Sequence, residues 1–254
     1  MNFQKAHIKN NFSQKCDQYN QDALVQKYAA AQLVDILITQ IAKFKQNSSD
    51  QILDLGSGSS FIAKNLFAHN SNFKIQEIDL SAEMLKIYNN PHNPITKICG
   101  DFEDFPFAAN SFDFILSSFS LQWCNNHQQL FAKIYQTLKP QGIFAFALPN
   151  SASFANLKNL PIHLNPLPDH AKLKTLLSST SFDEKYSKIE TFNQNYNNMI
   201  EALKSFKKIG TNYNKLTNIS NYKHLKKIYL KNFKANVNVK VDWSISYFFY
   251  LKNV

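Results

Sequence analysis

The chain has 254 residues, 44% of them hydrophobic, and a formal net charge of +10 at pH 7. This length exceeds one minimal α/β sheet domain, so we expect a single domain over residues 1–254 with a sizeable core and added elements. No run of eighteen apolar residues occurs and residues 1–11 are polar, so we expect no membrane span, no secretion signal and a cytoplasmic protein. The 3 cysteines and 7 histidines show no ligand spacing, so we predict no metal site.

The positive charge comes from lysine alone, because the chain contains no arginine. Any recognition of a carboxylate or phosphate must therefore use lysine, histidine, amides or backbone rather than a planar bidentate guanidinium. A basic surface favours an acidic partner, such as nucleic acid or an acidic protein. Two other interpretations stay open: a base-composition bias explains the lysines, and lysines on helices are commonly just solvated.

The amino-terminal part predicts a helix and a preceding arm. Residues 21–45 have apolar side chains at helical spacing, which indicates a helix that packs on the core. The expected buried residues are Leu24, Val25, Tyr28, Leu33, Ile36, Leu37, Ile41 and Phe44. Residues 11–20 are polar and aromatic, and they are placed where an arm could fold over a ligand pocket, with Tyr19 as the candidate contact. Alternatively, Tyr19 staples the start of the helix.

The most informative stretch is residues 51–60, Gln-Ile-Leu-Asp-Leu-Gly-Ser-Gly-Ser-Ser. It predicts a strand, a tight turn on two glycines and a helix from Phe61, which is a unit that binds nucleotides. The next strand, residues 75–80, carries Asp79 near its end, where a carboxylate can accept hydrogen bonds from both ribose hydroxyls. An ordinary strand-to-helix turn is the alternative, because a glycine pair alone is a weak signal.

Strands and helices alternate throughout residues 50–150. Residues 95–100 and 112–118 predict the third and fourth strands, residues 129–139 a helix, and residues 143–148 the fifth strand. Such alternation predicts a parallel sheet covered on both faces, with ligands at the carboxyl ends of the strands. The turn after the first strand has neither Gly-Lys-Ser/Thr nor the three-glycine dinucleotide motif, which argues against phosphate binding.

The carboxyl-terminal part predicts a lid followed by a closing strand. We expect a helix at residues 167–177, a sixth strand at 185–192, and two amphipathic helices near 195–209 and 221–233. The alternating residues 241–251 predict a seventh strand. The helical pair, residues 194–235, would then cover the carboxyl ends of the sheet, and it carries many of the lysines.

The pattern Asp-Leu-Gly-x-Gly, the acid on the second strand, Gly-Asp-Phe after the third and Leu-Lys-Pro-x-Gly before the fifth resembles the class I S-adenosylmethionine-dependent methyltransferases. The resemblance implies a Rossmann-like three-layer α/β sandwich whose seven-stranded, mostly parallel sheet has an antiparallel last strand, with an amino-terminal helical arm (1–46), a cofactor-binding core (50–150) and the lid. It implies S-adenosylmethionine as cofactor and S-adenosylhomocysteine as product. The implied cofactor-binding residues are Asp54, Gly56, Ser57 and Gly58 for the methionine part, Asp79 for the ribose, Asp101 and Phe102 for the adenine, with Leu80, Met84, Ser117 and Ser118 around them. Ser60 replaces the glycine of many relatives, so we expect a slight local adjustment there.

A closer resemblance, nearly end to end, is to the BioC family of malonyl-acyl carrier protein O-methyltransferases in biotin synthesis. The segments that carry it are Phe12-Ser13 with Tyr19 and Ala23, Ser120 to Cys124, residues 163–168, Ala202 to Gly210 and the closing strand. Gln14 and Lys204 stand where relatives tend to have arginine, and Phe206 replaces a leucine.

The second resemblance implies methylation of the free carboxylate of malonyl-acyl carrier protein, with an acidic carrier protein as partner. Since a carboxylate is already ionised at neutral pH, no general base is expected. The implied substrate-binding residues are Tyr19, Gln122, Trp123, Lys204 and Lys207. Gln122 and Trp123 could instead simply cover the sheet end.

Other functions are open. A methyltransferase of the same fold could act on another small acid or a quinone precursor, and a silent module could bind the cofactor without turnover. Methylation of RNA is disfavoured because Ser-Phe-Ser-Leu-Gln-Trp lacks the Asn/Asp-Pro-Pro-aromatic clamp of amine-modifying nucleic-acid enzymes.

Overall fold

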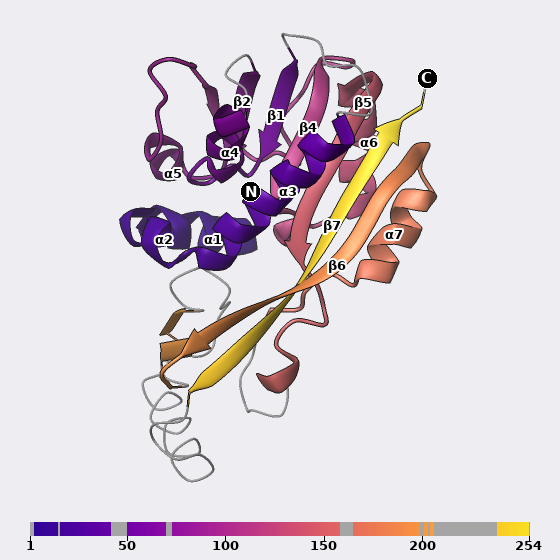
Figure 1. Cartoon of the computed structure of the whole chain (residues 1–254). Coiled ribbons are helices and arrows are strands. Elements are labelled where there is room, and N and C mark those ends of the chain that lie inside the picture. The colour runs from indigo at the N-terminus through magenta and orange to yellow at the C-terminus, as the bar shows by residue number, and fades with distance from the viewer. Residues whose placement is uncertain are drawn as a thin grey trace.

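The computed structural model describes residues 3–14, 16–41, 50–69, 73–157, 165–198, 201–202, 204–205 and 238–253. Within these ranges the fold is a seven-stranded sheet with helices on both faces (Figure 1). No helix in them is both long enough and apolar enough to cross a membrane.

The sheet has the strand order β3-β2-β1-β4-β5-β7-β6. The strands are β1 (Gln51–Leu55), β2 (Lys74–Asp79), β3 (Thr96–Cys99), β4 (Phe112–Ser118), β5 (Leu138–Pro149), β6 (Phe182–Tyr196) and β7 (Val239–Lys252). The first five strands run parallel, whereas β7 is antiparallel to both β5 and β6. The chain order reverses between β1 and β4, so the carboxyl ends of these strands form the edge where such sheets bind ligands.

Among the described residues, three helices of a full turn or more precede the sheet and four follow its strands. They are α1 (Phe3–Gln14), α2 (Cys16–Asp22), α3 (Leu24–Ile41), α4 (Phe61–His69), α5 (Ala82–Lys86), α6 (His127–Thr137) and α7 (His170–Ser178). Short 3-10 turns follow β4 at Leu121–Trp123 and β5 at Ala155–Leu157. Figure 1 shows α1 and α2 beside the carboxyl-terminal end of β1, below α4 and α5.

Alternation along the strands produces two apolar clusters, one on each face of the sheet. Ile52 of β1 joins the cluster that contains α3 and α4, whereas its neighbour Leu53 joins the cluster that contains α6 and α7. Successive side chains of a strand point to opposite faces, which accounts for this division. Central strands buried on both sides position the polar residues at their ends rigidly.

Strands β6 and β7 continue past the rest of the sheet as a two-stranded ribbon, seen at the bottom of Figure 1. Their pairing extends from Phe182 opposite Lys252 to Tyr196 opposite Val239. The β5 pairing of β7 stops at Ile245. The ribbon is anchored on α3, because the Tyr28 hydroxyl donates a 2.7 Å hydrogen bond to Glu190.

Several predicted boundaries were wrong. The expected helix at 21–45 is two helices that meet at Ala23, and Leu24, expected to be buried, is 49% exposed at the start of α3. The helix expected from residue 167 starts at His170, since Asp169 caps it and Pro168 precedes the cap. The sixth strand, expected at 185–192, is nearly twice as long.

The predicted lid lies mostly outside the described residues. Strand β6 extends to Tyr196, where the first lid helix was expected to have begun, and residues 201–202 and 204–205 are helical. The second lid helix, at 221–233, falls outside the described ranges, as does Lys207. The lid therefore stays a prediction.

Candidate functional site

The loop between β1 and α4 depends on two glycines in the left-handed backbone region, Gly56 (φ +69°) and Gly58 (φ +54°). A Cβ on Gly56 would lie 1.7 Å from the Ser120 hydroxyl oxygen, so this position admits no side chain. The Gly56 and Ser57 amides donate to the Ile78 carbonyl, which fixes the loop against β2. Ser60 is buried at φ +61°, so a serine occupies a conformation that favours glycine.

Asp54 is the most perturbed carboxylate of the site. Its side chain is fully buried, and neither oxygen has a hydrogen-bond partner among the described residues. Burial, with Glu77 and Asp79 adding like charge, raises the pKa of Asp54 well above its ordinary value. A buried carboxylate without a donor is costly, and a cationic or hydrogen-donating ligand in the adjacent cavity would relieve that cost.

Asp79 ends β2 and is held rigidly. One carboxylate oxygen accepts from the Gly58 amide and the other from the Ser81 amide, both at 2.9 Å. Burial raises the pKa of Asp79, and these two backbone hydrogen bonds oppose the rise. Each oxygen keeps a further lone pair, so the carboxylate can still accept hydrogen bonds from ligand hydroxyls.

After β3, Asp101 and Phe102 lie at the far end of the same cavity. Asp101 forms a 2.6 Å ion pair with Lys5 of α1, which also pairs with Glu103. The Lys5 ammonium stands 5.9 Å from the centroid of the Phe102 ring. The sequence did not indicate Lys5 as a site residue. Its ammonium lies beside Asp101, the carboxylate predicted to accept a hydrogen bond from the adenine amino group.

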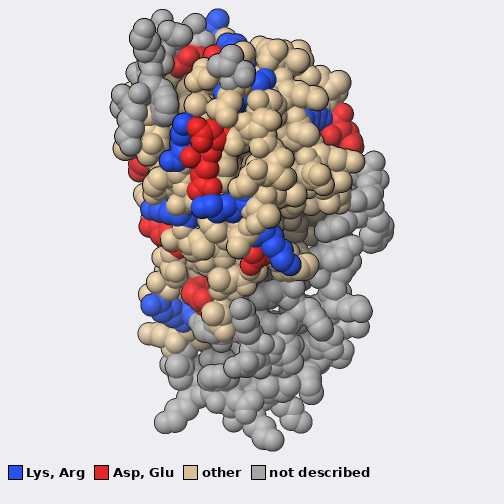
Figure 2. Space-filling view, turned by 90° about the vertical axis from the view of Figure 1, so that its right-hand side faces the viewer, with Lys and Arg blue, Asp and Glu red and all other residues tan. Residues whose placement is uncertain are grey.

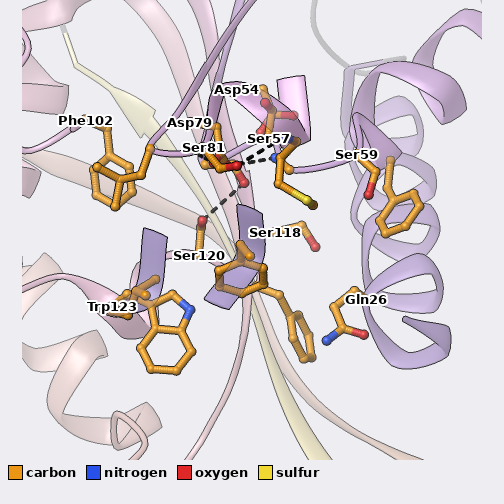
Figure 3. A pocket seen from close by; sticks show the side chains of 18 of the residues that line it. Gln26, Asp54, Ser57, Ser59, Asp79, Ser81, Phe102, Ser118, Ser120 and Trp123 are labelled. Atoms are coloured by element: carbon orange, nitrogen blue, oxygen red, sulfur yellow. Dashed lines mark hydrogen bonds between the residues drawn. The ribbon is translucent and has the colours of Figure 1, made fainter. Parts of the chain in front are cut away.

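These groups line one cavity of about 870 Å³, part of it open to solvent, which we term the main chamber. In Figure 3, Phe102 and Trp123 border the chamber on one side and Ser59 and Gln26 on the other, with Asp54 and Asp79 between them. Of the predicted cofactor-binding residues, those lining the main chamber are Asp54, Gly56, Ser57, Gly58, Asp79, Leu80, Met84, Asp101, Phe102 and Ser118.

A smaller cavity of about 440 Å³, which we term the side chamber, adjoins the main one. Five residues line both chambers: Phe12, Tyr19, Gln26, Phe119 and Trp123. The side chamber also contains Gln122, Pro149, Phe154, Asn165 and Leu167. No Lys, His, Asp or Glu is among its described lining residues, so the chamber is aromatic with amide and hydroxyl groups.

Tyr19 lies at the junction of the two chambers. Its ring stacks on Phe61 with centroids 6.3 Å apart and contacts Phe12 edge-to-face at 5.5 Å. Burial, and secondarily the charge of Asp79, raises the pKa of its hydroxyl, which stays protonated. The hydroxyl is therefore a hydrogen-bond donor at any physiological pH.

One predicted cofactor-binding residue does not line the main chamber. Ser117 is fully buried, and its hydroxyl donates a 2.8 Å hydrogen bond to the Leu55 carbonyl, because alternation along β4 directs it away from the chamber that Ser118 lines. Gln122 lines the side chamber and donates 2.7 Å to the Phe119 carbonyl. Lys204 is exposed and lines neither chamber.

The sequence reading missed Lys5, Ile8, Gln26 and Ser120, which all line the main chamber. The residues of α1 that line it are Lys5, Ile8, Lys9 and Phe12, spaced as one face of a helix. That spacing is the signal that could have identified them. Because this face mixes lysines with apolar residues, the spacing did not produce an apolar stripe that would indicate a buried helix face.

Comparison with known proteins finds methyltransferases among the similar sequences. Residues 53–146 match a family model described as "Methyltransferase domain". A malonyl-[acyl-carrier protein] O-methyltransferase of Methylovorus sp. is 23% identical over 221 residues, covering 81% of this chain and 73% of that protein. The biotin biosynthesis bifunctional protein BioHC of Cellvibrio japonicus is 32% identical over 139 residues, and the match spans 54% of this chain but only 26% of that protein.

Solved structures show the fold. A methyltransferase structure from Bacillus halodurans superposes with a TM-score of 0.62 at 15% identity, covering 89% of this chain and 99% of that one. Phosphoethanolamine N-methyltransferase 2 of Haemonchus contortus, in complex with S-adenosyl-L-methionine, gives a TM-score of 0.52 at 17% identity and covers 88% of this chain and 52% of that one. Sheet order, glycine loop and superposed structures together show that this chain has the fold of the class I methyltransferases, with a methyltransferase domain matched over residues 53–146.

Proposed function

We propose that the chain transfers the methyl group of S-adenosylmethionine to the free carboxylate of malonyl-acyl carrier protein. The observation that carries the proposal is the pair of adjoining chambers, which share five lining residues. The main chamber has unpartnered Asp54 and rigid Asp79, whereas the side chamber is aromatic and contains no basic or acidic side chain among its described residues. The relatives named malonyl-[acyl-carrier protein] O-methyltransferase support the choice of substrate.

The residues of the main chamber fit S-adenosylmethionine. Asp54 would accept hydrogen bonds from the ammonium of the methionine part, which removes the cost of its unpartnered burial. Asp79 would accept from the ribose hydroxyls, and Phe102 would cover the adenine. When bound, this cofactor supplies an electrophilic methyl group on a sulfonium centre.

The side chamber suits a nucleophile that needs no activation. A malonyl carboxylate is ionised at neutral pH, so the absence of a His, Asp or Glu from the described lining is compatible with its reaction. The chain's contribution is to hold the carboxylate oxygen in line with the methyl group and to exclude water. Phe119 and Trp123, which line both chambers, are placed to do so.

Neutral donors also suit the charge change of the reaction. The carboxylate loses its charge as the ester forms, so a strong ion pair would stabilise the substrate more than the transition state. The Tyr19 hydroxyl can orient the carboxylate without such an ion pair, because burial keeps it protonated. We therefore propose that Tyr19, Trp123 and the amide side chains near them orient the substrate carboxylate that receives the methyl group.

Docking of an acidic carrier protein is proposed for the lysine-rich segment. Residues 206–237 contain eight lysines and no Asp or Glu, and Lys204 precedes them on the surface. Figure 2 shows that the described part of the face in view carries lysine and acidic side chains side by side, which is no single-sign patch. Charge complementarity with the lysine segment would raise the association rate and orient the thioester arm.

The test is transfer of labelled methyl from S-adenosylmethionine to malonyl-acyl carrier protein, with base-labile methyl ester as the readout. Malonyl-coenzyme A and free malonate are assayed in parallel. We expect fastest transfer to the carrier-bound substrate and, below saturating cofactor, at least tenfold slower transfer with Asp54→Asn, the control that lacks the cofactor-binding carboxylate. Transfer to free malonate at an equal rate would instead favour a small-acid methyltransferase. Cofactor binding without transfer to any of the three would refute the proposed reaction.

The docking proposal has its own test. The double variant Lys204→Glu/Lys207→Glu should raise KM for malonyl-acyl carrier protein at least tenfold and leave kcat/KM for malonyl-pantetheine unchanged, because the small thioester does not contact the lysines. Equal effects on both substrates would show that these lysines do not dock the carrier protein.

A further inference from the structure

Helix α1 lies across the main chamber and is bound at both ends to the loops that form it. At its amino-terminal end, Lys5 forms a buried ion triplet with Asp101 and Glu103, whose side chains are 6%, 9% and 12% exposed in that order. The Asp101 oxygen that pairs with Lys5 lies 2.6 Å from the ammonium, and the other accepts from the Glu103 amide at 3.0 Å. The triplet therefore joins α1 to the loop after β3.

The carboxyl-terminal end of α1 is bound to the loop after β2. The Ser13 hydroxyl lies 2.8 Å from the Ser81 hydroxyl and donates to Glu83 at 2.6 Å. Ser81 in turn donates its amide to Asp79. One twelve-residue helix thus connects the loop predicted to hold the adenine with the loop predicted to hold the ribose.

Between these two attachments, α1 covers the chamber. Ile8 and Phe12 line it one and two turns after Lys5. On its other side, the ion triplet borders an outer cavity of about 710 Å³ that also contains Asn125 and Asn126. Lys5 and Asp101 line both spaces, so their contact separates the main chamber from this outer cavity.

From this arrangement we propose that Lys5 is a positioning residue for the adenosine end of the cofactor, acting through Asp101 and Glu103 to hold α1 closed over it. The inference rests on the proposed use of S-adenosylmethionine. Lys5 neutralises Asp101 while that carboxylate keeps a lone pair for the exocyclic amino group of adenine. Cofactor exchange then requires the ion triplet to separate and α1 to leave the chamber.

The charge state of Lys5 supports this role. Burial acts to lower the pKa of Lys5, but its hydrogen bonds to Asp101 and Glu103 outweigh burial and raise the pKa above its ordinary value. The ammonium is thus retained throughout the physiological range. Without it, two carboxylates would face each other in a buried place, which favours an open helix.

The experiment measures dissociation of S-adenosylhomocysteine from Lys5→Met, which keeps the aliphatic stem and removes the charge. We expect dissociation to accelerate at least tenfold and Lys5→Arg, which restores the charge, to recover most of the difference. Lys174→Met is the matched control: it removes the lysine of a 2.7 Å ion pair with Glu184 that lines neither chamber. Its dissociation rate should equal that of the wild type.

Hydrogen exchange distinguishes a specific role of Lys5 in holding α1 closed from a general loss of stability in the variant. S-adenosylhomocysteine should slow amide exchange of residues 3–14 in the wild type and not in Lys5→Met, while the urea midpoint of the cofactor-free variant changes little. Equal dissociation rates in wild type and Lys5→Met would overturn the role of Lys5 and leave the proposed function intact. Failure of the wild type to bind S-adenosylhomocysteine at all would overturn both.

Discussion

Glu77 offers a quantitative test of the electrostatics beneath the glycine loop. It lies on β2 with a fully buried side chain, in register with Asp54 on β1. Burial raises the pKa of Glu77 from 4.5 to about 6, and the nearby Ser60 hydroxyl and Lys97 only partly offset the rise. A carboxyl raised to this extent in the folded protein costs about 2 kcal/mol of stability at pH 7.

The sign follows from proton uptake on folding. Between pH 4.5 and about 6 the folded protein binds a proton at Glu77 that the unfolded chain does not, so the stability from this group is present below pH 4.5 and lost as the pH rises through about 6. We subtract the free energy of unfolding of wild type from that of Glu77→Gln at each pH. This difference should therefore be about 2 kcal/mol more positive at pH 7.5 than at pH 4. Any cost of burying the amide is the same at both pH values and cancels.

Urea unfolding of both proteins at pH 4 and pH 7.5, at one ionic strength, measures this difference. Glu201→Gln, which removes an exposed carboxylate, is the matched control and should show a much smaller change with pH. If the free-energy difference between Glu77→Gln and wild type is the same at both pH values, the argument from burial is refuted.

Four further predictions concern the main chamber. Asp54→Asn should weaken S-adenosylhomocysteine binding at least tenfold by calorimetry. Wild-type affinity should rise with pH, because the free protein's raised Asp54 pKa falls when an ammonium binds, and a flat profile would contradict this. Gly56→Ala should abolish binding through its clash with the Ser120 oxygen, and adding Ser120→Gly should restore part of it; no recovery would mean that backbone conformation alone decides. Tyr19→Phe should lower kcat/KM for the acceptor about tenfold with cofactor affinity within twofold, whereas an equal loss of both would place its hydroxyl on the cofactor.

The α/β fold could be predicted because its signals are local. Apolar runs ending in Gly56, Asp79 and Asp101 predicted strands β1 to β3, and the main chamber contains all three residues. Ser117 was assigned wrongly because two adjacent serines end β4, and only the register of the strand decides which one faces the cavity.

Contacts over long sequence distances could not be predicted. Lys5 meets Asp101 across 96 residues, and nothing around either residue in the sequence specifies that contact. Tyr19 and Gln26 line the same cavity but belong to two helices separated by a break at Ala23. Helical spacing along the sequence therefore did not reveal that the two side chains lie together. The side chamber is lined by residues from Phe12 to Leu167, which only the folded sheet brings together.

The position of β7 between β5 and β6 determines the order in which the sheet can be completed during synthesis. β6 leaves the ribosome first but pairs with β7, from which residues 197–238 separate it in the chain. Until β7 emerges, β6 and the helix α7 that packs on it have no strand to join, and the apolar edge of β5 stays uncovered. Completion of the sheet thus requires insertion of β7 between two strands that are synthesised before it, and until then the edges of β5 and β6 stay open to pairing with other chains.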